Sequence, residues 1–234
     1  MQQYAAREGF AYAKESKRNG RGWRNGHRRG SRPDSAGSDG RRRAVQRQAL
    51  ASAVASAVSG TTLSLAAKCV YNLKAALPEV SKVLTINGNR ATLQRSYAAG
   101  TAAFTILTVA GSGILTISEL NFRHGGGAIA VIDLGQLTVN GGTFTGNAAA
   151  DGGAIYSNAG TSAPQINDAT FARNTATGSG GAIYNNSASY SVSVNGSVFT
   201  GNKAAADGAI WEYGIGGTVT AATFRGNTAG TQGS

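Results

Sequence analysis

Hydrophobic and polar positions alternate in short segments along the second half of the chain. A β-branched apolar residue stands five positions before each of five phenylalanines. The apolar residues are Ile117, Val139, Ile166, Val194 and Val219, and the phenylalanines are Phe122, Phe144, Phe171, Phe199 and Phe224. The residue directly before each phenylalanine is mostly Thr, which suits the opposite face of a strand. This period of two predicts half-buried β-strands.

The segment 144–156, FTGNAAADGGAIY, returns along the chain. Its second copy starts at Phe171, its third at Phe199, and a partial fourth at Phe224, so the spacings are 27, 28 and 25 residues. A degenerate earlier copy at Phe122 lies 22 residues before the first. Each repeat contains short strands and turns rich in Gly and Asn, with no room for a crossover helix of about a dozen residues. A repeat of this length is one structural unit that buries its apolar face by stacking on its neighbours.

We therefore expect an all-β fold, a single-stranded parallel β-helix in which each coil pairs with the next at about 4.8 Å. In this fold the five phenylalanines form an internal ladder, and Ile155, Ile183 and Ile210 form an aliphatic one. The asparagines Asn147, Asn174, Asn202 and Asn227 follow each phenylalanine by three residues. We expect them at turns, because Asn tolerates the left-handed conformation. A second series, Asn140, Asn167 and Asn195, recurs four residues before the phenylalanine.

These motifs resemble a known family. Phe-x-x-Asn followed by Gly-Gly-Ala-Ile, specific in 144–211 and extending over about 122–227, is similar to the repeat of chlamydial polymorphic outer membrane proteins and related bacterial β-helix proteins. The segments 60–65, 69–73, 84–89 and 91–93 resemble the opening coils of secreted members of that group. The resemblance implies a right-handed, pectate-lyase-like solenoid on an exported or surface protein, and it does not imply an enzyme.

Composition separates an N-terminal arm from the rest. Residues 1–47 contain 13 Lys and Arg against 4 acids, whereas residues 48–234 contain 9 against 7. We interpret residues 1–43 as a disordered Arg/Gly-rich arm, because low hydrophobicity with high charge opposes folding. A start codon placed too far upstream, nucleic-acid binding through phosphate contacts and an unusual export signal are the alternatives. The composition favours a solvated tail over nucleic-acid binding, and the segment is too polar for a convincing signal peptide.

Residues 44–59 are predicted to form an amphipathic helix that ends near Gly60. Leu50, Val54 and Val58 fall at i, i+4 and i+8 on one side. Such a helix would cover the exposed backbone edge of the first coil. The β-helix then spans 60–234, with irregular strands at 61–65, 70–73, 83–86, 91–93 and 104–109 and clear repeats at 115–227. The last copy lacks Gly-Gly-Ala-Ile, so we expect a solenoid that is incomplete at its C-terminal end and able to associate end to end there.

Candidate chemistry is sparse. Cys69 is the only cysteine, so it forms no disulfide within the chain and is expected in the core. We predict no metal and no cofactor, and no run of 18 apolar residues indicates a transmembrane helix. Glu119 and Asp168 share an offset before their phenylalanines and would lie two coils apart, about 9.6 Å, which is the edge of the range for an inverting glycosidase. Turn acids on a solvated face are the simpler interpretation.

Other charged residues also suggest turns. Asp151 and Asp207 precede glycines at slightly different offsets, as turn residues do. Arg123, Arg173 and Arg225 follow their phenylalanines by one or two positions, in the manner of a solvated basic stripe.

The candidate binding surface is aromatic. Tyr156, Tyr184 and Trp211 follow the isoleucines of the ladder, so alternation predicts that they point outward as a strip suited to sugar rings or a protein, unless a flanking loop covers them. We therefore predict a non-catalytic, secreted or cell-surface module for adhesion or display, with a glycan or protein ligand. A polysaccharide lyase or glycoside hydrolase of the same fold is the alternative.

Overall fold

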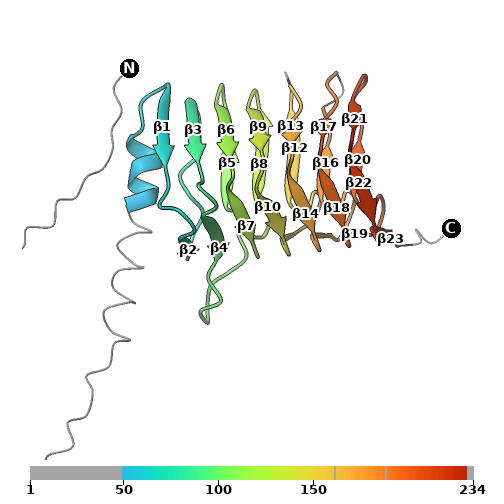
Figure 1. The fold of residues 1–234 in the computed structure, drawn as a ribbon, viewed down its shortest axis with the longest axis horizontal. Coiled ribbons are helices and arrows are strands. Elements are labelled where there is room, and N and C mark those ends of the chain that lie inside the picture. The colour runs from blue at the N-terminus through green and yellow to red at the C-terminus, as the bar shows by residue number, and fades with distance from the viewer. Residues whose placement is uncertain (1–48, 161, 188, 231–234) are drawn as a thin grey trace, which may run out of the picture.

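The computed structural model describes residues 49–160, 162–187 and 189–230, and within them the chain winds as a right-handed parallel β-helix. The strands of successive coils lie side by side (Figure 1) and form four parallel sheets. The predicted arm 1–43 and residues 44–48 of the predicted helix lie outside the described residues.

Two of the sheets have seven strands each. Sheet A contains β1 (Thr61–Ser64), β3 (Val83–Asn87), β6 (Ile114–Ser118), β9 (Gln136–Asn140), β13 (Gln165–Asn167), β17 (Ser193–Asn195) and β21 (Thr218–Thr220). Sheet B contains β2 (Val70–Leu73), β4 (Thr92–Arg95), β7 (Asn121–Arg123), β10 (Thr143–Thr145), β14 (Thr170–Ala172), β18 (Val198–Thr200) and β22 (Thr223–Arg225).

The other two sheets are smaller. Sheet C contains β5 (Leu107–Val109), β8 (Ile129–Asp133), β12 (Ile155–Ala159), β16 (Ile183–Asn185) and β20 (Ile210–Glu212). Sheet D contains β11 (Ala148–Ala149), β15 (Thr175–Ala176), β19 (Lys203–Ala204) and β23 (Thr228–Ala229).

The predicted phenylalanine ladder is confirmed. Phe122, Phe144, Phe171, Phe199 and Phe224 are register partners from coil to coil, and their rings stack with centroids 4.7–5.0 Å apart. The first four rings are fully buried, whereas Phe224 in the last described coil is 45% exposed. Ile155, Ile183 and Ile210 are likewise in register, with Ile210 only partly buried at the same end. The interior of the described coils is therefore a packed core whose side chains become more exposed in the last coil.

The first asparagine series has a different role from the one predicted. The backbone of these residues is not left-handed; that conformation falls on the residue before each of them, at Gly146, Arg173, Gly201 and Gly226. The side chains of Asn147, Asn174 and Asn202 are instead fully buried. They form an internal hydrogen-bonded ladder, because a tight turn brings backbone groups inside the tube where water cannot reach them.

Each rung of this ladder repeats the same contacts. The backbone N and the Nδ2 of Asn147 both donate to Oδ1 of Asn174 at 3.0 Å, and Asn174 donates in the same way to Asn202. Nδ2 of Asn174 also donates to the Phe144 carbonyl at 2.9 Å. The second series differs, since Asn140, Asn167 and Asn195 lie in register on the outer face of sheet A.

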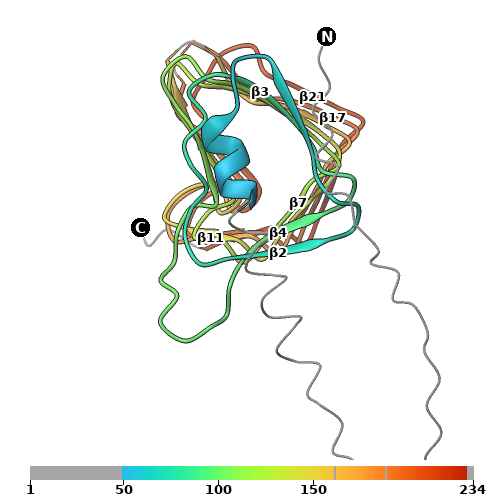
Figure 2. The same cartoon turned by 90° about the vertical axis from the view of Figure 1, so that its left-hand side faces the viewer.

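A helix covers the N-terminal end of the stack (Figure 2). It spans residues 49–56 of the described chain, and Leu50 and Val54 are buried against the core as predicted. The prediction for Val58 was wrong: it lies past the end of the helix and is 73% exposed, because the chain turns at Ser59 and Gly60 into β1. The Lys82 ammonium donates to the carbonyls of Ala55 and Ala57, which binds the helix C-terminus to the next coil.

The first coils follow the predicted strands less closely. β2 has the predicted bounds, but β4 starts one residue later than predicted and β5 begins only at Leu107. Residues 96–105 form a loop that carries no strand and protrudes from the tube in Figure 2. Cys69 is half-buried and packs against the core. No helix among the described residues has the length and hydropathy needed to cross a membrane.

Candidate functional site

The predicted aromatic strip lies on the outer face of sheet C. Tyr156, Tyr184 and Trp211 are register partners on β12, β16 and β20, and all three are half-buried. Their isoleucine neighbours point into the tube, so the outward direction predicted by alternation is confirmed. Ala130 is the register partner of Tyr156 in the preceding coil, so the strip begins at Tyr156. We call Tyr156, Tyr184 and Trp211 the aromatic column.

The rings of the aromatic column stack on one another. The centroids of Tyr156 and Tyr184 are 5.4 Å apart with planes 4° from parallel, and those of Tyr184 and Trp211 are 4.3 Å apart at 8°. Both faces of Tyr184 are therefore in contact with protein, and the column presents ring edges and hydroxyls along its length. A sugar ring therefore cannot stack on Tyr184, and fewer ring faces are open to a ligand than the sequence predicted.

Burial raises the pKa of Tyr184, and the nearby Asp151 carboxylate and Tyr156 add to this effect. The phenol is therefore neutral at physiological pH and available as a hydrogen-bond donor.

A flat surface remains at the end of the column, where Tyr213 joins Trp211. The two rings are 6.1 Å apart with planes 4° from parallel, and Tyr213 is 61% exposed. Tyr213 follows Trp211 by two residues, just past the end of β20, and its ring is parallel to the Trp211 ring. We call Trp211 and Tyr213 the two-ring platform. Tyr213 was not predicted from the sequence, although its i+2 spacing from Trp211 indicates it.

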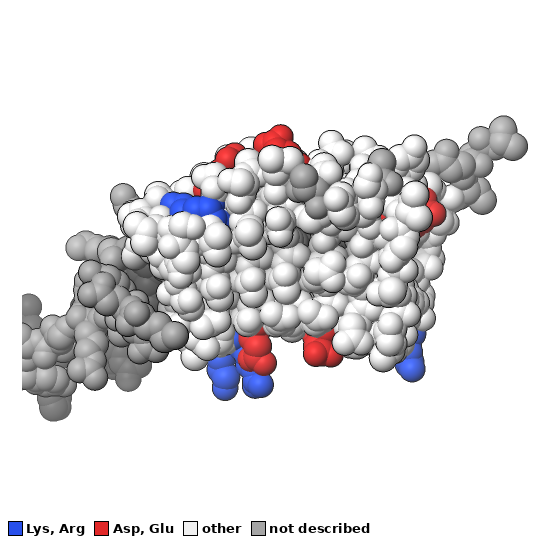
Figure 3. Space-filling model, turned by 90° about the horizontal axis from the view of Figure 1, so that it is seen from above, with Lys and Arg blue, Asp and Glu red and all other residues white. Residues whose placement is uncertain are grey.

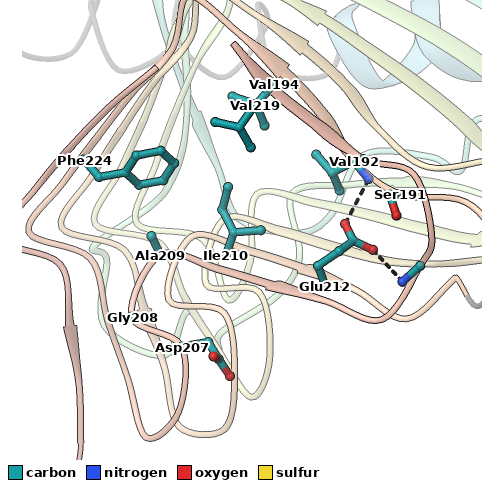
Figure 4. Close-up of a pocket in the computed structure, with 12 residues that line it drawn as sticks. Ser191, Val192, Val194, Asp207, Gly208, Ala209, Ile210, Glu212, Val219 and Phe224 are labelled. Atoms are coloured by element: carbon teal, nitrogen blue, oxygen red, sulfur yellow. Dashed lines mark hydrogen bonds between the residues drawn. The ribbon is translucent and has the colours of Figure 1, made fainter. Parts of the chain in front are cut away.

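Next to the platform the interior of the tube opens in a hollow of about 420 Å³ (Figure 4). Val194, Ile210, Val219 and Phe224 line its apolar part. Glu212 lies on its rim, where its carboxylate accepts hydrogen bonds from the backbone N of Val192 and of Gly214 and from Nδ2 of Asn185.

The carboxylate of Glu212 therefore links the end of β16 to Val192 and Gly214. The hollow is the end of the core ladders, and the predicted end-to-end association through this coil stays a prediction.

A second hollow of about 400 Å³ borders sheet A. Its lining is uncharged and includes Ile114, Gln136, Thr138, Gln165, Tyr190 and Ile215. This hollow was not anticipated, because its residues come from coils with no common motif.

The acidic residues are dispersed. Glu119 forms an exposed ion pair with Arg90 at 3.2 Å. Glu119 and Asp168 both have left-handed backbones at turns, and Gly141 lies between them, since a Cβ built there would be 3.8 Å from Glu119 Cγ and 4.0 Å from the Asp168 carbonyl oxygen. Asp151 caps a turn by accepting from the Ser179 backbone N at 2.8 Å, and Asp207 has a left-handed backbone. Within the described ranges, no three His, Cys, Asp or Glu residues are grouped as metal ligands would be.

The basic residues do not form one contiguous stripe. Arg123 is the register partner of Thr145, and Arg225 is the partner of Thr200, while Arg173 lies on a left-handed turn. His124 is on the equivalent turn, with its ring 4.9 Å from that of Tyr97. Burial and the charges of Arg123 and Arg95 lower the pKa of His124.

The stacked coils identify the chain as a solenoid repeat protein. The family model described as right handed beta helix region matches residues 80–229, and the chain therefore belongs to this family. No curated protein and no solved structure matches the chain.

Proposed function

We propose that this chain is a non-catalytic binding module and that the two-ring platform, with the aromatic column beside it, is its ligand-contacting surface. The observation that carries the proposal is that the rings of Trp211 and the exposed Tyr213 are parallel, with centroids 6.1 Å apart. Aromatic rings combine a large apolar face with little conformational entropy to lose, and for this reason they are common in contact surfaces.

We propose a glycan as the ligand. Flat aromatic pairs fit the apolar faces of sugar rings, and the hydroxyls of Tyr156 and Tyr184 continue the surface with hydrogen-bonding groups. The dispersed carboxylates favour binding over hydrolysis, because Glu119 is paired with Arg90 and Asp151 is used to cap a turn. The motif resemblance to polymorphic outer membrane proteins and to secreted β-helix proteins supports a further proposal, that the module acts outside the cell or at its surface.

The test is affinity electrophoresis through gels that contain single purified polysaccharides, both neutral and acidic. We expect at least one polysaccharide to retard the parent chain, and Trp211→Ala to weaken that retardation at least tenfold, which corresponds to about 1.4 kcal/mol. Tyr97→Ala is the matched control, because Tyr97 is 66% exposed but lies on the loop 96–105, outside the column.

Two results would contradict the proposal. One is the absence of retardation by every polysaccharide, or equal retardation of parent and Trp211→Ala. The other is the release of reducing ends or unsaturated uronates from a retained polysaccharide, which would replace the binding module by an enzyme of the same fold.

A further inference from the structure

The outer face of sheet A carries a regular array of short uncharged side chains. Two columns of outward side chains run through all seven strands, and on each strand their members are two residues apart. The first column is Thr62, Thr85, Thr116, Thr138, Gln165, Ser193 and Thr218, and the second is Ser64, Asn87, Ser118, Asn140, Asn167, Asn195 and Thr220. Every one of these residues has a hydroxyl or an amide, and all are half-buried or exposed. In the first four coils the first column is threonine only.

The register fixes the dimensions of this array. Neighbouring strands of a sheet lie about 4.8 Å apart, and positions i and i+2 along a strand lie about 6.6 Å apart. The array is therefore a two-dimensional lattice of hydrogen-bonding groups. These repeats are close to the distances between oxygen atoms on faces of hexagonal ice.

The side chains of the array are held in place. Threonine is β-branched, so its χ1 is restricted on a strand. In the second column Nδ2 of Asn167 donates to Oδ1 of Asn140 at 3.0 Å, which fixes the orientation of both amides. Figure 1 shows the strands of sheet A side by side with little change of direction, and side-chain ladders are one of the devices that keep a sheet flat. Little entropy would be lost when this surface orders water or contacts a rigid ligand.

The array is also free of charge. Neither column contains Lys, Arg, Asp or Glu, and Figure 3 shows the charged residues of this face gathered at its edges. The outer face of sheet B differs, because Arg123 and Arg225 occupy one of its columns. Charged groups bind disordered hydration water strongly, whereas threonine holds water at its hydroxyl and excludes it at its methyl group.

We propose that sheet A binds the surface of ice crystals, with the threonine and asparagine columns holding water molecules in positions of the ice lattice. On β1, β3 and β6 the uncharged array repeats in two directions and fits a crystal surface better than a single flexible molecule, whereas Thr138 and Gln165 line the second hollow. This inference uses a different sheet from the proposed glycan surface, so the failure of one leaves the other standing.

The test measures thermal hysteresis and inhibition of ice recrystallisation by the full chain, using microscopy in a cooled cell. We expect faceted ice crystals and inhibition at micromolar protein concentration. Thr116→Lys places a charge at the centre of the array and should reduce inhibition at least tenfold. Thr85→Tyr, which keeps high β-propensity while breaking the flat surface, is the second variant in case the lysine variant does not fold.

Thr145→Lys is the control, because Thr145 has an equivalent half-buried outward position on β10 of sheet B. It should retain the inhibition of the parent, and circular dichroism should show that all variants are folded. Absence of hysteresis and of inhibition in the parent would overturn the proposal. Equal loss in Thr116→Lys and Thr145→Lys, or full activity in the folded Thr116→Lys and Thr85→Tyr chains, would also overturn it.

Discussion

Substitution of Asn174 by Ala should destabilise the solenoid far more than the same substitution of Asn167 in the same coil. Asn174 is fully buried, and its Oδ1 accepts from both the backbone N and the Nδ2 of Asn147. Its Nδ2 donates to the Phe144 carbonyl and to Asn202 Oδ1. Alanine removes all four of these contacts and leaves the Asn147 backbone N without its acceptor inside the tube.

The magnitude follows from the number of buried groups affected. A buried polar group left without a partner costs about 1–3 kcal/mol. Two such groups, the Asn147 backbone N and the Phe144 carbonyl that loses a donor, predict a loss of about 2–6 kcal/mol. Asn167 donates a single hydrogen bond to Asn140 on the outer face of sheet A, where water replaces a lost partner. Asn167→Ala should therefore cost no more than about 0.5 kcal/mol, as is usual for surface substitutions.

The assay is urea unfolding followed by circular dichroism, with the midpoints of parent, Asn174→Ala and Asn167→Ala compared at equal slope. Midpoints are the appropriate readout, because a repeat array can depart from two-state unfolding. A fall in midpoint confined to Asn174→Ala is expected. Equal midpoints for the two variants would refute the reasoning that the buried ladder carries stability.

Three further predictions concern the cap, the open end and pH. The double variant Leu50→Asp, Val54→Asp should aggregate, as measured by light scattering, because charges at these buried positions separate the helix from the first coil. Val58→Asp, at an exposed position, should leave the protein monodisperse. A monodisperse double variant would contradict the capping role of the helix. Phe171→Ala should cost about 3–5 kcal/mol in urea unfolding, and Phe224→Ala less, because Phe224 is already 45% exposed; equal costs would count against the core assignment. Folding lowers the pKa of His124, so the free energy of unfolding should fall as the pH decreases through about 6.5, the ordinary pKa of histidine. His124→Gln should reduce this pH dependence of stability between pH 8 and pH 5. An unchanged dependence would show that other groups cause it.

Much of the fold follows from the repeat spacing. Phe144, Phe171 and Phe199 recur at nearly constant intervals with a β-branched residue at a fixed offset, and in a solenoid this pattern determines the register. The first coils were less predictable, because the loop 96–105 interrupts them and Phe104 lies outside any strand. A segment that occurs only once in the sequence has no second copy to align with, so its register with the neighbouring coil cannot be predicted.

The two asparagine series show where sequence reasoning reached its limit. Asn140 and Asn147 are the same residue type at equally regular spacing, yet one is on the outer face and the other is fully buried. Turn propensity correctly located a turn near Asn147, but the left-handed residue is Gly146. Whether an asparagine is buried depends on whether backbone groups inside the tube need a hydrogen-bond partner at that position. This need is set by the neighbouring coils.

The candidate site was predicted in position but not in orientation. Alternation placed Tyr184 and Trp211 outside, as found. Strands about 4.8 Å apart hold in-register rings close to stacking distance, so the rings contact one another by their faces and only the end of the column offers a flat surface. This stacking could have been predicted from the strand spacing, and the pairing of Trp211 with Tyr213 could have been predicted from their i+2 spacing.

The central claim is that residues about 25 residues apart become neighbours along one axis, and distances between spin labels test it most directly. With Cys69 replaced by Ser, pairs of labels at Thr62 and Gln165, and at Thr62 and Thr218, span four and six coils of the same column. Pulsed electron resonance should give distances near 19 Å and 29 Å, which follow from about 4.8 Å per coil. Distances that do not increase in proportion to the number of coils, or broad distributions for both pairs, would contradict the stacked solenoid and every surface inferred from it.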